Sequence, residues 1–114
     1  MLNLDPAKTQ AVADQTRQAF AALDTALADT AHLTSAFVAA SQNSGLTASE
    51  SQRILKQIHD SATKLIESRS DMIRATALLT RCLEHSAIPV TSVGCPIGLE
   101  LEERETARHL TLVA

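Results

Sequence analysis

Histidine and carboxylate side chains are the first residues in this sequence whose types and spacing could do chemistry. Asp29 lies one helical turn before His32, and His59 falls at the same level if the chain folds into a helical hairpin. A carboxylate three residues before a histidine occurs in the metal sites of helical bundles. His32, however, falls on the helix face opposite the apolar residues, and such sites need several more inward carboxylates. We therefore expect exposed histidines, no metal and no other cofactor.

Histidine phosphotransfer is a second chemistry that helical proteins with exposed histidines perform. The segments His32-Leu-Thr-Ser, His59-Asp-Ser-Ala and His85-Ser-Ala-Ile lack the nearby Lys-Gly pair that is usual at a phosphotransfer histidine. The chain also contains no P-loop, dinucleotide-binding glycine pattern or catalytic-triad signature. The sequence therefore favours a protein that is not an enzyme.

Arg69 is the charged residue with the least expected position. It falls inside the apolar stripe of the second predicted helix, and Asp24 lies at a suitable level on the first. A guanidinium withdrawn from water needs a partner, and a carboxylate can accept two of its hydrogen bonds. Two interpretations follow: a pair that fixes register and the choice of partner chain, or an arginine at the stripe's edge that extends to water.

The two cysteines, Cys82 and Cys95, are too few for a disulfide framework or a four-cysteine zinc site. Cys82 flanks the apolar stripe, where a thiol behaves as a small hydrophobic group. Cys95 precedes Pro96 in a loop, and we expect it to be a free surface thiol. A lone Cys-Pro pair is too weak a pattern to predict haem binding.

Two long helices must position these residues. Asp5-Pro6 is typical of a helix N-terminus, and Gly45 supplies a stop after a run without glycine or proline. Thr47 and Glu50 have capping-box spacing, and Pro89 ends the run that follows. The sequence predicts helices over about residues 6–43 and 48–87.

Apolar and small residues recur in both helices at steps of three and four residues, which is the period of an amphipathic helix. Because the turn between the helices is short, they must run antiparallel. The predicted fold class is all-α, a long two-helix hairpin over residues 1–88 with a tail over 89–114. The residues expected to form its core and interface are Phe20, Leu23, Leu27, Phe37, Ile54, Ile58, Leu65, Met72 and Leu79.

The apolar stripe of the second helix is wider than one neighbouring helix can cover. We therefore expect two hairpins to pair, coiled-coil fashion, into a homodimeric four-helix bundle. The alternative is that the tail folds back as a third helix. Helix formers over 100–108 favour a short helix there, whereas the alternation of Leu99 with Leu101 and of Leu110 with Leu112 suits a strand pair.

Composition and charge exclude several classes of function. Aromatic residues make up 2% of the chain and the net charge is −3, so neither a stacking surface nor a basic stripe for nucleic acid is expected. The N-terminus does not resemble a secretory signal, and no apolar run approaches the ~20 residues of a membrane span. We expect a cytoplasmic protein.

The uncharged stretch 30–49 forms the tip of the predicted hairpin. Phe37, Val38 and Leu46 could dock a partner there, because interfaces are depleted in charge around large apolar groups; the other interpretation is ordinary hairpin core with a polar turn. The leading hypothesis is a homodimeric interaction protein: an adaptor, a chaperone-like partner or a regulatory subunit. The alternatives are an amphipathic coat protein of a lipid or storage-granule surface and, less favoured, a metal- or ligand-binding bundle.

Overall fold

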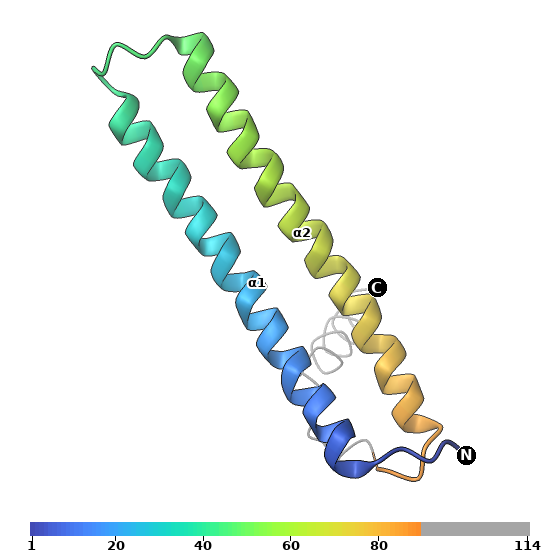
Figure 1. Ribbon diagram of the computed structural model, residues 1–114. Coiled ribbons are helices and arrows are strands. Elements are labelled where there is room, and N and C mark those ends of the chain that lie inside the picture. Colours follow the sequence, from blue (N-terminus) through green and yellow to red (C-terminus); the bar gives the residue numbers. More distant parts are fainter. Residues whose placement is uncertain (90–114) are drawn as a thin grey trace, which may run out of the picture. The chain divides into compact units, whose positions relative to one another are not determined.

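The chain forms two long α-helices joined by a short turn, as the computed structural model shows for residues 1–89, the part that it describes (Figure 1). Helix α1 spans Pro6–Ser41, and helix α2 spans Ala48–Glu84. This confirms the predicted all-α helical hairpin. The tail from residue 90 onward lies outside the described residues, as do the third helix and the strand pair considered for it.

Each end of the hairpin is a compact unit in which part of α1 packs against part of α2. We call Met1–Ala19 together with the described residues from Met72 to Pro89 the terminal unit. The turn unit is Phe20–Asp71, which contains the connection between the helices. The candidate sites below each lie within one of these units.

Side-chain caps begin both helices where the sequence predicts them. The backbone N–H of Lys8 donates to Asp5 Oδ1 over 3.0 Å at the start of α1. At the start of α2, Glu50 N–H donates to Thr47 Oγ1 over 3.1 Å, and Thr47 N–H donates to Glu50 Oε2 over 3.3 Å. The capping box is therefore confirmed. It satisfies backbone donors that have no partner within the helix.

Both helices end before the predicted residues. Helix α1 ends at Ser41 because Asn43, with φ +57°, takes the left-handed conformation that stops it, and Gly45, with φ +86°, lies further on in the turn. Helix α2 ends at Glu84 rather than near residue 87. There the Ser86 hydroxyl donates to the carbonyl of Leu83 over 2.7 Å, so a side chain takes over the helix's own hydrogen bonding.

The N-terminal segment pairs with the end of α2, an arrangement that the sequence did not predict. Leu2 N–H donates to the carbonyl oxygen of His85 over 2.7 Å, beside an isolated parallel bridge between Leu2 and Ser86. This contact brings apolar residues from both ends of the described chain together. The resulting cluster consists of the buried Ala13 and Leu83 and the partly buried Leu4 and Ile88.

The inward face of α2 is rotated from the predicted stripe. Ile54 and Leu79, expected in the core, are 41% and 40% exposed, so they are not part of the hairpin's own core. Their place is taken by Leu55, Ala62 and Thr76, which are half-buried or buried. The predicted stripe passed through Ile54 and Leu79 with Leu55 and Ala62 on its flank, whereas in the structure these flanking residues face inward. Of the other expected core residues Phe20 is buried, and those half-buried are Leu23, Leu27, Phe37, Ile58, Leu65 and Met72.

Candidate functional site

A polar cluster joins the two helices inside the turn unit. Arg69 Nε on α2 lies 2.9 Å from Asp24 Oδ1 on α1. The guanidinium carbon of Arg69 also lies 5.8 Å from the centroid of the Phe20 ring, within the range of a cation–π contact. The structure thus brings together the arginine and the carboxylate that the sequence singled out.

Solvent reaches both partners of this ion pair. The side chains of Arg69 and Asp24 are 38% and 56% exposed. Pairs with such exposure are screened by water and salt and contribute about 0.2–1 kcal/mol to folding. Arg69 therefore combines the two sequence interpretations, because it is paired and it also extends to the surface. Its influence on the choice of partner stays a prediction.

The hairpin tip contains an open hollow of about 410 Å³. Phe37 and Leu46 line it, whereas Val38, the third residue of the predicted docking tip, does not. The remaining lining comes from the last turn of α1, the connection and the first turn of α2: Ala40, Ser41, Ser44, Gly45 and Glu50. Partner docking at this tip stays a prediction.

A smaller and more apolar cavity, of about 230 Å³, lies within the terminal unit. Its wall is formed by Leu4, Val12, Ala13, Leu79 and Leu83. Cys82 and the threonines Thr9, Thr16, Thr76 and Thr80 complete it. Sequence reasoning missed this cavity. The available signal was the spacing of the threonines, because Thr9 with Thr16, and Thr76 with Thr80, each lie on one helix face.

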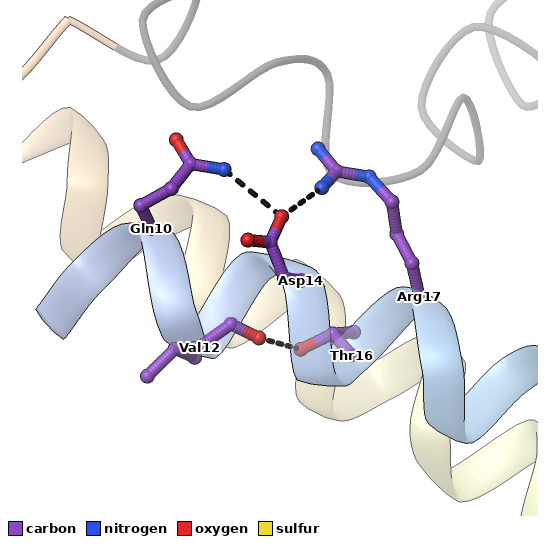
Figure 2. Close-up of polar contacts among 5 residues, drawn as sticks. All are labelled: Gln10, Val12, Asp14, Thr16 and Arg17. Atoms are coloured by element: carbon purple, nitrogen blue, oxygen red, sulfur yellow. Dashed lines mark hydrogen bonds and ion pairs between the residues drawn. The ribbon is translucent and has the colours of Figure 1, made fainter. Parts of the chain in front are cut away.

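Three of these threonines bond to a backbone carbonyl one helical turn earlier. Thr9, Thr16 and Thr76 each donate to the carbonyl oxygen four residues earlier, at 2.7, 2.7 and 2.8 Å. Figure 2 shows one of these bonds, from Thr16 to the carbonyl of Val12. Thr80 differs: it is 2% exposed, and its Oγ1 has no hydrogen-bond partner. An unsatisfied buried hydroxyl is uncommon and destabilising.

Neighbouring polar contacts within α1 support that helix. Asp14 Oδ1 accepts hydrogen bonds from Gln10 Nε2 over 3.1 Å and from Arg17 Nη1 over 2.8 Å (Figure 2). All three residues lie on the same helix at steps of three or four, and Asp14 is 54% exposed. Such pairs add a few tenths of a kcal/mol to helix stability.

Asp29 and the three histidines among residues 1–89 lie at the surface. Asp29, His32 and His59 are exposed, and within residues 1–89 no three His, Cys, Asp or Glu side chains come together in a way that could hold a metal ion. Cys82, predicted to flank the apolar stripe as a small hydrophobic group, carries a free thiol and is exposed. It lies at the end of α2, where its side chain lines the cavity. Cys95 lies outside the described residues.

Comparison with protein-family models, with curated proteins and with solved structures finds no match to this chain. Over residues 1–89, neither helix combines the length and the apolar character that crossing a membrane requires.

Proposed function

We propose that this protein is a non-enzymatic helical interaction protein that pairs with a second copy of itself. One observation supports the proposal. The hydrophobic side chains that residues 1–89 bury are Ala13, Phe20 and Leu83, while large aliphatic ones stay open to solvent. The most exposed of these aliphatic residues after the N-terminal methionine are Leu33 at 54%, Ile66 at 56% and Leu78 at 61%.

A second hairpin is the partner favoured by this small number of buried and larger number of exposed hydrophobic side chains. Small domains bury a low fraction of their surface on folding, and their stability is correspondingly marginal. In a two-fold dimer the same surface is used by both copies, so apolar residues of one hairpin meet their equivalents on the other. Interfaces of obligate dimers resemble a domain core cut in half.

In the turn unit, α2 offers apolar residues on both sides of its inward face. Ile54 is exposed on one edge and Ile66 on the other, by the 3.6-residue period of the helix. Arg69 lies one turn after Ile66 and is held by Asp24. In the dimer this pair would stand beside the apolar contact, where polar groups fix register and partner choice at some cost in stability.

The mass of the full chain in solution tests the pairing. Light scattering or sedimentation should give twice the chain mass of 12.2 kDa. Ile54→Ser and Ile66→Ser, made singly and together, should weaken the dimer and show which edge of α2 forms the interface. Gln57→Ser and Thr63→Ser replace exposed polar residues of the same helix and should leave the mass unchanged. A monomeric parent chain, or a double variant that dimerises as well as the parent, would overturn the proposal.

Arg69→Leu tests whether the polar pair selects the partner. The substitution removes a charge beside apolar residues, so the melting temperature should rise. If the pair fixes register, the variant should also give a mixture of masses instead of one dimer. A variant with the parent's melting temperature and a single dimeric mass would show that the pair has no such role.

Coating of a lipid or storage granule is the second candidate, because the exposed aliphatic residues could also face an apolar surface. The mixed charges of the polar face lack the lysine and arginine excess usual for anionic membranes. Flotation with phosphatidylcholine vesicles, with and without anionic lipid, separates the two candidates. Recovery of the protein with the vesicles would favour the coat, and an unbound dimer would favour the interaction protein.

A further inference from the structure

The apolar cavity of the terminal unit points to an activity separate from pairing. We propose that it binds a small, neutral, largely apolar molecule whose single hydroxyl or carbonyl group hydrogen-bonds to Thr80. Three properties of the cavity support this assignment: its size, its uncharged wall and its one unsatisfied hydroxyl.

The volume sets the size of the ligand. A cavity of about 150 Å³ lined by aliphatic and aromatic side chains stays dry and takes up benzene. The present cavity holds about 230 Å³, which by the same scale accommodates roughly nine or ten non-hydrogen atoms. This is smaller than the sites of drug-sized ligands, which begin near 300 Å³.

The side chains that line the cavity determine which charge a ligand can carry. Within residues 1–89, no Asp, Glu, Lys, Arg or His side chain lines the cavity. Of the four threonine hydroxyls, those of Thr9, Thr16 and Thr76 are already bonded to backbone carbonyls one turn earlier in the chain. A charged ligand would lose its hydration without compensation, so a neutral ligand is required.

Thr80 supplies the one polar contact. Its hydroxyl is shielded from water and has no partner, although a helical threonine can donate to the carbonyl four residues earlier, as Thr76 does. Because the Thr80 side chain forms part of the wall, rotation about χ1 can turn its hydroxyl toward a bound group. A ligand with one hydroxyl or carbonyl would satisfy both itself and Thr80, which a pure hydrocarbon cannot do.

Two probes of equal shape test the assignment on the full chain. 4-Propylphenol has ten non-hydrogen atoms and one hydroxyl, and propylbenzene lacks only the hydroxyl. Titration followed by methyl NMR should shift the signals of Val12, Leu79 and Leu83 saturably, with 4-propylphenol binding about tenfold tighter. In a Cys95→Ser background, the bound phenol should also slow alkylation of Cys82, which lines the cavity.

The valine variants identify the contact. Thr80→Val should abolish the preference for the phenol while keeping the binding of propylbenzene. Thr76→Val removes a hydroxyl that is already satisfied, so it should keep the preference. Equal affinity of the parent chain for both probes, or the same preference in Thr80→Val, would refute the role of Thr80. If no signal shifts saturably up to the solubility limit of the probes, the site is refuted. This holds whether residues 90–114 or a second copy fills the cavity instead.

Discussion

The buried threonine hydroxyls of this protein differ in whether they form a hydrogen bond, and two neighbouring residues show the difference. Thr76 and Thr80 lie one turn apart on α2, both are buried, and both line the same cavity. The hydroxyl of Thr76 donates to the carbonyl of Met72, and that of Thr80 donates to nothing. The neighbouring pair therefore offers a matched comparison of a satisfied and an unsatisfied buried hydroxyl.

Thr80→Val should raise the free energy of unfolding by about 1 kcal/mol, because it removes a desolvated hydroxyl without a partner and keeps a side chain of similar shape. Thr76→Val should give no such gain, since it also removes a hydrogen bond. Urea unfolding followed by circular dichroism measures both changes. An equal gain in the two variants would mean that hydroxyl pairing does not cause it.

The pair of Arg69 and Asp24 should show a small coupling energy. Alanine substitutions at the two positions, made singly and together, should give about 0.5 kcal/mol of coupling, and less in concentrated salt, because both side chains contact water. Asp29 lies further along α1 and serves as the control, for which coupling to Arg69 should vanish. A coupling that is zero at low salt would mean that the pair contributes nothing to folding.

At the scale of the helices, both starts were predictable and both ends were less so. A start depends on a few local residues, and Asp5, Thr47 and Glu50 carry the side chains that cap it. The end of α2 combines the local bond from the Ser86 hydroxyl to the carbonyl of Leu83 with a distant contact, because the carbonyl of His85 accepts a hydrogen bond from Leu2 near the N-terminus. Local sequence contains no signal for that contact.

Thr47→Ala should lower the free energy of unfolding by about 1 kcal/mol, because it removes the acceptor for the Glu50 N–H at the start of α2. Thr63→Ala is the matched control within the same helix. The Thr63 hydroxyl donates to the carbonyl of His59 on its own helix and does not cap a helix end. Because alanine favours helix, the free energy of unfolding should stay the same or rise by a few tenths of a kcal/mol. Comparable losses in both variants would argue against the capping box.

The candidate sites were predictable in proportion to how far they depend on helical spacing. Asp24 and Arg69 were paired from their level along an antiparallel hairpin, and the structure places them 2.9 Å apart. The rotation of α2 about its own axis was harder to predict from the sequence. Ile54 and Leu79 are exposed, although their hydrophobicity predicted that they would face inward. Small residues such as Ala62 let helices approach, a packing effect that a count of large side chains does not detect. The cavity was missed for the same reason.

At the scale of the whole molecule, two features offer apolar contact: the exposed aliphatic residues of the helices, and the partly open cavity of the terminal unit, whose wall includes the exposed Val12 and Leu79. A second copy would satisfy the first through the surface of the helices. A small ligand would satisfy the second inside the terminal unit, where Thr80 lies. Stability measurements can distinguish pairing from ligand binding, because only pairing makes the stability of the ligand-free chain depend on protein concentration.

The melting temperature of the full chain should therefore rise with protein concentration, by about 5 °C for a hundredfold increase if folding and pairing occur together. The double variant Ile54→Ser/Ile66→Ser should melt at a temperature independent of concentration, since its apolar edges no longer pair. Addition of 4-propylphenol should stabilise both proteins alike, because the cavity lies in the other unit from these isoleucines. A parent chain whose melting temperature does not change with concentration would contradict pairing and leave the response to the phenol as a separate measurement of the cavity.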